Sequence, residues 1–117
     1  MKLILLVLAV GVGLSACGGE TSGRCNSGSA TTADTVDLTA SGFQPSCFKV
    51  SKGTTVTFTN TDSKDHTATA NVAQVDYFDT GTLGAGQSAT NTFNVAGTIN
   101  FHCVIHPITE LGVIVVE

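Results

Sequence analysis

The segment GTINFHCVIHP (residues 97–107) decides the fold, because it joins the pattern of a β-strand to a cysteine and a histidine three positions apart. Apolar side chains recur at every second position from Ile99 to Cys103, and polar residues stand between them. A period of two with polar residues on one face predicts a half-buried strand. Cys103 is therefore expected to point into the core, and His106 can return toward it across a turn that begins near Pro107.

The same alternation extends outward from this segment along the chain. Strands are expected over TVDLTA (35–40), TTVTFTN (54–60) and LGVIVVE (111–117), separated by turn-forming stretches rich in Gly, Asn, Asp and Ser. The last strand is apolar on both faces, which predicts a central position in its sheet. No window has convincing helical periodicity. Several short strands at regular spacing predict an all-β fold, either a sandwich or a barrel.

A third candidate ligand is His66, which follows a polar loop and opens an expected strand in TDSKDHTATA. Two imidazoles and one thiolate in a trigonal arrangement match the preference of blue copper. His66, Cys103 and His106 are therefore the predicted copper ligands, although either histidine taken alone could be structural. His102 falls on the opposite face of its strand and is interpreted as a surface residue. Thr67, beside a predicted ligand, is expected to pack on its strand or to form a local hydrogen bond.

Two long stretches carry a family resemblance: GFQPSCFKVSKGTTVTFTNTDSKDHTATA (42–70) and FDTGTLGAGQSATNTFNVAGTINFHCVIHP (78–107). They resemble the two halves of the cupredoxins, most closely the small plastocyanin-like and pseudoazurin-like bacterial proteins. The resemblance covers nearly the whole domain and implies an eight-stranded Greek-key β-sandwich, one type 1 copper near one end, and electron shuttling. Carried over residue by residue, the family's ligands are His66, Cys103 and His106.

The chain departs from this family at the axial position, where a methionine usually follows the second histidine. Its one methionine, Met1, lies in the expected signal. Counting forward from His106 places Leu111 at the axial position, counting back from the next glycine places Glu110 there, and Thr109 is a weaker third choice. Leu111 would favour Cu(I) and raise the reduction potential, whereas Glu110 would favour Cu(II) and lower it. Leu111 is preferred, because a carboxylate near the edge can remain in water.

The first residues, MKLILLVLAVGVGLSAC, have one positive charge and then an apolar run too short for a comfortable membrane span, which predicts a secretory signal. Their end resembles the lipobox of bacterial lipoproteins, which implies cleavage before Cys17 and a lipid on that cysteine. The alternative is an ordinary signal in which Cys17 is incidental. We expect a signal peptide at 1–16, a lipidated, flexible tether at 17–33 and a cupredoxin-like domain at 34–117. The protein is then exported and lipid-anchored to the cell envelope, facing the periplasm or the outer surface.

The remaining cysteines divide by role. Disulfides persist in exported proteins, so Cys25 and Cys47 are expected to pair, and closing their loop contributes roughly 3 kcal/mol. Two free thiols are the alternative. The pairing leaves Cys103 as a free thiol, which a metal ligand requires.

Charge limits the partners. Without Lys2, which leaves with the signal, four basic residues face nine acidic ones, a formal charge of −5. The few Lys and Arg residues do not cluster, which argues against nucleic acid. Four acids lie in or beside turns and are interpreted as solvated loop charges, with docking of a basic partner as the alternative: Asp62, Asp65, Asp76 and Asp79.

The expected function is that of a monomeric one-electron carrier with a protein redox partner. A copper storage or delivery module and a purely structural sandwich are the alternatives. The chain is not expected to be an enzyme, because no nucleophile–base arrangement exists beyond Cys103, whose thiol faces inward.

Overall fold

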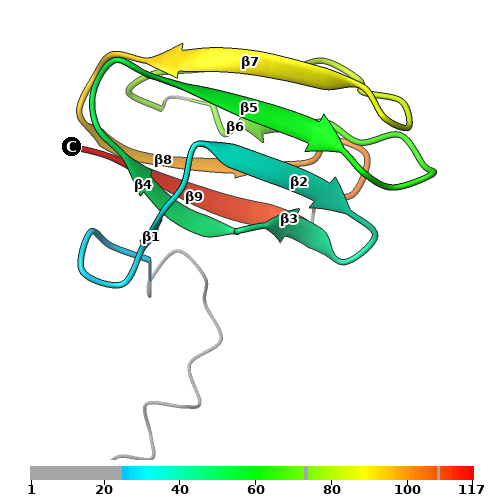
Figure 1. Cartoon of the computed structure of the whole chain (residues 1–117), viewed down its shortest axis with the longest axis horizontal. Coiled ribbons are helices and arrows are strands. Elements are labelled where there is room, and N and C mark those ends of the chain that lie inside the picture. Colours follow the sequence, from blue (N-terminus) through cyan, green and yellow to red (C-terminus); the bar gives the residue numbers. More distant parts are fainter. Residues whose placement is uncertain (1–24, 73, 108) are drawn as a thin grey trace, which may run out of the picture.

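The computed structural model of the chain describes residues 25–72, 74–107 and 109–117, which form a sandwich of two β-sheets (Figure 1). The strands are β1 Thr31–Thr32, β2 Thr35–Thr39, β3 Gly42–Gln44, β4 Cys47–Val50, β5 Thr54–Asn60, β6 Thr69–Ala70, β7 Ser88–Phe93, β8 Gly97–His102 and β9 Leu111–Val116. One sheet has the order β1-β4-β9-β8-β6, and the other has the order β3-β2-β5-β7. The predicted all-β sandwich is confirmed, with nine strands in the described residues where about eight were expected. The part of the chain that the structure describes contains no helix long and apolar enough to cross a membrane.

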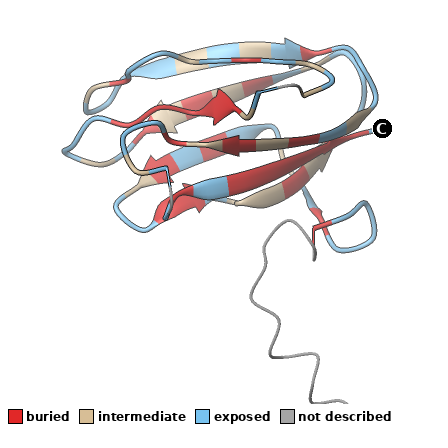
Figure 2. Ribbon diagram, turned by 180° about the vertical axis from the view of Figure 1, so that it is seen from behind, coloured by how far each residue is buried: buried red, intermediate tan, exposed pale blue. Residues whose placement is uncertain are grey.

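The predicted strands form close to their expected bounds. β5 covers the predicted residues, and β2, β8 and β9 each end within a residue of the prediction. β9 lies between β4 and β8, parallel to the first and antiparallel to the second. All of its residues after Leu111 are buried, as the continuous red band in Figure 2 shows. The central position predicted from its two apolar faces is therefore confirmed.

Phenylalanine side chains fill the space between the sheets. All six phenylalanines are buried, and the ring of Phe101 on β8 lies at their centre, with its centroid 4.6 Å from that of Phe43 and 5.8 Å from that of Phe78. Gly112 of β9 is the cross-strand partner of Phe101, and a Cβ atom at this position would overlap the phenylalanine ring. A glycine is therefore required where the ring approaches the neighbouring backbone.

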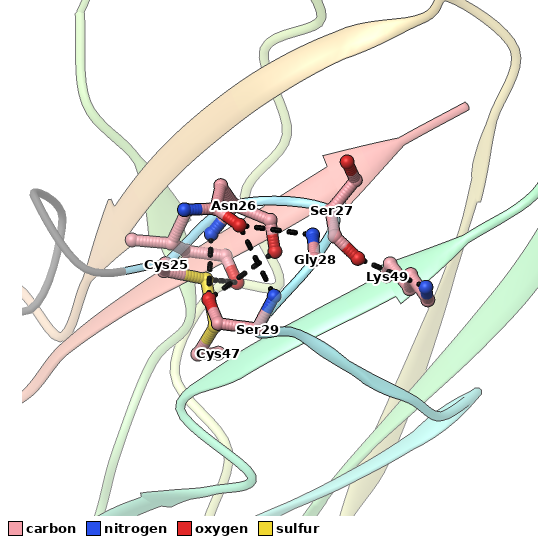
Figure 3. Close-up of a disulfide and its surroundings, with 8 residues drawn as sticks. Cys25, Asn26, Ser27, Gly28, Ser29, Cys47 and Lys49 are labelled. Carbon is pink, nitrogen blue, oxygen red and sulfur yellow. Dashed lines mark hydrogen bonds between the residues drawn. A yellow bond between two sulfur atoms is a disulfide. The ribbon is translucent and has the colours of Figure 1, made fainter.

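A disulfide joins Cys25 to Cys47, the pairing expected from the sequence (Figure 3). Cys25 and Ala30 pack with Val113 and Val115 on the outer face of the five-stranded sheet, and β1 pairs with β4. The turn between Cys25 and Ala30 is closed by Asn26, whose side-chain oxygen accepts hydrogen bonds from the backbone N–H groups of Gly28 and Ser29. The packed body thus includes residues 25–33, which the sequence placed in the tether. The predicted signal, Cys17 and the rest of the tether lie outside the described residues.

The loop that follows β5 and the loop between β8 and β9 lie at the same end of the sandwich, at the right in Figure 1. The first carries His66, and the second runs from Cys103 to Glu110. The two sheets hold these loops against each other, so residues far apart in the sequence meet at one end of the core.

Candidate metal centre

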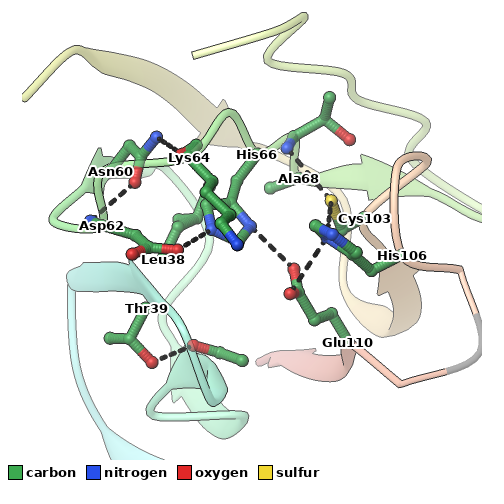
Figure 4. Close-up of polar contacts among 12 residues, drawn as sticks. Leu38, Thr39, Asn60, Asp62, Lys64, His66, Ala68, Cys103, His106 and Glu110 are labelled. Carbon is green, nitrogen blue, oxygen red and sulfur yellow. Dashed lines mark hydrogen bonds and ion pairs between the residues drawn. The ribbon is translucent and has the colours of Figure 1, made fainter. Parts of the chain in front are cut away.

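Four side chains with metal-binding groups converge at this end: His66, Cys103, His106 and Glu110 (Figure 4). One ligand atom from each lies within 4.8 Å of the ligand atoms of the other three. All three predicted copper ligands are therefore brought together. Glu110, one of the two main axial candidates, joins them.

Cys103 supplies the buried thiol at the end of β8, and its side chain is fully buried. Among the described cysteines it is the one without a disulfide partner. The backbone N–H of Thr67 donates a hydrogen bond of 3.3 Å to its sulfur. This bond fixes the position of the sulfur, and a thiolate sulfur is the form of cysteine that binds metals.

The loop after Cys103 is closed by backbone hydrogen bonds. The N–H of His106 donates to the carbonyl of Cys103, the N–H of Glu110 donates to the carbonyl of His106, and the N–H of Cys103 donates to the carbonyl of Glu110. The hydroxyl of Thr67 accepts a bond from the N–H of Val104, which ties this loop to the one that carries His66. The spacing of Cys103, His106 and Glu110 is therefore held by the backbone itself.

His66 is held by backbone pairing with Leu83, through hydrogen bonds in both directions. Its side chain is 2% exposed and lies between two carboxylates. Its Nδ1 is 2.9 Å from an oxygen of Glu110, and its Nε2 is 2.8 Å from an oxygen of Asp62. Nδ1 thus faces the cluster, and Nε2 faces the loop.

His106 completes the cluster from the solvent side. Its side chain is 37% exposed, and its Nδ1 lies 3.8 Å from the sulfur of Cys103 and 3.2 Å from an oxygen of Glu110. Both histidines therefore present Nδ1 to the same small space. His106 is the one member of the cluster with substantial access to solvent.

The structure does not support the preference for Leu111 over Glu110. Leu111 is 46% exposed at the start of β9, and Thr109 is also exposed, whereas the side chain of Glu110 is 8% exposed and contacts both histidines. The reason for the preference was that a carboxylate near the edge can stay in water. That reason does not hold, because the backbone N–H of Cys103 bonds to the carbonyl of Glu110, and the Glu110 side chain lies against the two histidines and not in water.

His102 lies on the other face of β8, as predicted, and is not a member of the cluster. Its Nδ1 is 2.6 Å from the side-chain oxygen of Asn71. Ile108, in the same loop as His106, lies outside the described residues.

The carboxylates change the protonation of His66. Burial lowers the pKa of His66, but its hydrogen bonds to Asp62 and Glu110 and their charges outweigh burial, so the pKa is raised above the ordinary 6.5. The hydrogen bond with His66, followed by one from the backbone N–H of Ser63, lowers the pKa of Asp62. The metal-free cluster therefore favours a positive imidazolium between two negative groups.

This arrangement predicts how the stability of the metal-free protein depends on pH. A raised pKa for His66 contributes stability that is complete below its unfolded value near 6.5 and is lost as pH rises through the higher folded value. Urea unfolding in the presence of a chelator should therefore show a free energy of unfolding that falls as the pH rises above about 6.5. A His66→Gln variant should lose this part of the slope. An unchanged slope would contradict the ion pair.

The donor set fits a transition-metal ion such as copper. Thiolate and imidazole donors lie about 2.0–2.3 Å from zinc, so two donors on one such ion stand at most about 4.6 Å apart. The donors would therefore have to move closer together on binding an ion than the 4.8 Å spread of the metal-free cluster. A buried thiol with two imidazoles suits copper or zinc, while a carboxylate adds a harder anionic donor.

Three residues near the site make contacts there that the sequence did not specify. Asp62 was interpreted as a solvated loop charge, yet it contacts His66. Asn60 is fully buried at the end of β5, and Thr67 bonds to the loop of Cys103. The one sequence signal for Asp62 was its position four residues before a predicted ligand.

The fold and the site together define an all-β sandwich with a thiol–imidazole–carboxylate cluster at one end. Residues 5–116 match the family model described as the cupredoxin-like domain. Because this match covers most of the chain, the protein belongs to the cupredoxin-like family. A search of curated proteins finds no match.

Solved structures agree with this assignment. The Cu-containing nitrite reductase (NirK) from Thermus scotoductus SA-01 is 31% identical, with a TM-score of 0.66 over 71% of this chain, which spans 22% of that enzyme. The Cu(I) form of an amicyanin variant is 30% identical, with a TM-score of 0.64 over 75% of this chain and 85% of that one. A purple cupredoxin from Nitrosopumilus maritimus is 23% identical, with a TM-score of 0.64 over 73% of this chain and the whole of that one, and supports the fold alone.

Proposed function

We propose that the protein is a type 1 copper protein that carries single electrons. The observation that carries this proposal is the buried Cys103 thiol, which shares a small space with the Nδ1 atoms of His66 and His106. These three residues would hold the metal, and Glu110 would supply a fourth, anionic donor. When bound, copper would supply a one-electron Cu(II)/Cu(I) couple.

The chain's own contribution is a rigid frame. The backbone bonds that close the 103–110 loop, the pairing of His66 with Leu83 and the bond from Thr67 to the sulfur fix the donor positions before metal binds. A frame that changes little between oxidation states lowers the reorganisation that accompanies electron transfer.

His106 is the proposed route for the electron, because it is the cluster residue that reaches the surface. Exposed apolar side chains stand beside it in the same loop, namely Val104 at 52% and Ile105 at 44% exposure. They form an apolar rim on which a protein redox partner could dock. No catalytic role is proposed for the chain, which acts here as a carrier and as a monomer.

The anchor is part of the proposal. With the lipid on Cys17, the chain stays at the cell envelope, and the segment up to Cys25 links the lipid to the sandwich. A Cys17→Ser variant should be released from the membrane fraction and should lack the lipid mass. Fractionation and mass spectrometry of the purified protein check both points. Continued membrane attachment of the unlipidated variant would contradict the anchor.

A second function, copper storage or delivery, is favoured by one observation. Glu110 contacts both histidines of the cluster, and a hard anionic donor holds Cu(II) better than Cu(I). Such a site could release copper on reduction.

A potentiometric titration of the copper-loaded protein separates the two functions. A carrier should show a reversible one-electron transition and retain copper in both states, as measured by metal analysis after gel filtration. Loss of copper on reduction would support delivery and would contradict electron carriage.

A further inference from the structure

The imidazole of His66 offers two nitrogens, and the loop before it determines which one faces the metal site. Nδ1 points toward the cluster, whereas Nε2 is 2.8 Å from Oδ2 of Asp62 (Figure 4). Resting on the proposed function, we infer that Asp62 is a positioning residue that fixes the ring orientation and the tautomer of His66 for metal binding.

The contact is built into the fold and is not a chance surface pair. The side chain of Asp62 is 15% exposed and that of His66 is 2% exposed. The other oxygen of the Asp62 carboxylate accepts a hydrogen bond of 2.8 Å from the backbone N–H of Ser63. Both carboxylate oxygens therefore have defined partners, which fixes the plane that the imidazole meets.

Asn60 holds the loop that presents Asp62. Its side-chain oxygen accepts a bond of 2.8 Å from the N–H of Asp62, and its amide nitrogen donates to the carbonyls of Lys64 and Leu83 at 2.7 and 2.8 Å. Leu83 is also the backbone partner of His66. One buried amide thus links the loop of Asp62 to the strand pairing of His66, so the carboxylate and the ring are placed together.

The chemistry follows from the hydrogen count of imidazole. A neutral ring carries one N–H, and donating it from Nε2 to Asp62 leaves the lone pair on Nδ1, the nitrogen that faces Cys103 and Glu110. A carboxylate in this position also makes the ring a stronger donor, and such partners are typically worth 10–100-fold in metal affinity. Asp62 would therefore strengthen binding without touching the metal.

A matched pair of variants separates this role from a general effect of charge. Asp62→Ala removes the hydrogen bond and the charge, whereas Asp65→Ala removes the same charge from an exposed residue next to His66. In the purified full-length chain, Zn(II) affinity measured by competition with a chromophoric chelator should fall about 10–100-fold for Asp62→Ala and much less than tenfold for Asp65→Ala. Zinc avoids any dependence on electron transfer.

A second pair, Asp62→Asn and Asp65→Asn, covers the case in which Asp62→Ala does not fold. The asparagine oxygen can still accept from Nε2–H, so Asp62→Asn should bind zinc more tightly than Asp62→Ala but more weakly than the unchanged chain. Nuclear magnetic resonance of the zinc-loaded protein adds a readout that loss of stability alone would not move. The Nε2–H signal of His66 should be protected from exchange in the unchanged chain and in Asp62→Asn, and it should be lost in Asp62→Ala.

Two results would overturn this inference and leave the proposed function standing. One is an equal loss of zinc affinity in the Asp62 and Asp65 variants. The other is a metal-bound His66 in the unchanged chain whose Nε2–H is not protected from exchange. A chain that binds neither zinc nor copper would overturn the proposed function together with it. A selective loss at Asp62, with an Nε2–H signal that depends on this residue, would establish it.

Discussion

Replacing Cys103 with serine should abolish the intense thiolate-to-copper absorption that a type 1 site would show in the visible range. The band requires a sulfur donor on copper, and Cys103 is the thiol of the cluster. The fold should survive, because serine is similar in shape and its hydroxyl oxygen can still accept the hydrogen bond from Thr67. Visible spectra of the copper-loaded variant and of the unchanged chain, recorded at equal copper content, check the loss of the band.

The matched control is Thr92→Ser, which retains a hydroxyl on β7, away from the cluster. It should leave the absorption unchanged, and circular dichroism should show the same β-sheet signal for both variants. A band of full intensity in Cys103→Ser would mean that another group supplies the absorption, and the copper assignment would fail.

Replacing Glu110 with glutamine should raise the reduction potential of the copper-loaded protein. Glutamine keeps the shape of the side chain but removes its negative charge, which favours Cu(II) over Cu(I). If this change weakens Cu(II) binding about a hundredfold relative to Cu(I), the potential rises by about 120 mV. Cyclic voltammetry and the visible spectrum measure the two expected changes, in potential and in colour.

Two control variants test whether the rise in potential belongs to Glu110 itself. Glu117→Gln makes the same charge change at an exposed position on the chain terminus, and Leu111→Ala shortens the other axial candidate. Both should leave the potential nearly unchanged. A potential that responds to Leu111→Ala and not to Glu110→Gln would restore Leu111 as the residue facing copper.

The strands and the three predicted ligands could be read from the sequence because both depend on local patterns. Alternation along 54–60 reports which face is buried, and β5 has those bounds. Cys103 shares the inward parity of Ile99 and Phe101, so its burial follows from the strand itself. His66 and His106 needed the family pattern as well, because both stand in loops.

The fourth member of the cluster, Glu110, could not be predicted from a local sequence pattern. Glu110 and Leu111 are neighbours at the point where a loop becomes β9, and the direction of each side chain depends on where the strand begins. Leu111 is preferred from the sequence because a carboxylate near the edge can remain in water, but Leu111 itself pairs with His102 at the end of the sheet and faces water. The carboxylate turns inward because the backbone of its loop bonds to that of Cys103.

The start of the packed body and the role of Asp62 also depend on contacts between distant residues. A segment of Gly, Ser and Thr predicts a tether, yet the disulfide to Cys47 brings Cys25 onto the sheet, where Ala30 also packs. Asp62 is a charged residue in a polar turn, and such residues are usually exposed to solvent. Its approach to His66 depends on a loop conformation that Asn60 stabilises from the core.

The most direct test of the central claim is titration of the purified chain with Cu(II), followed by visible absorption and electron paramagnetic resonance. We predict an intense visible band that saturates at one copper per chain and disappears on addition of one electron equivalent, then returns on reoxidation. Tight copper binding without that band, or a band that does not return, would contradict the assignment of the protein as a one-electron copper carrier.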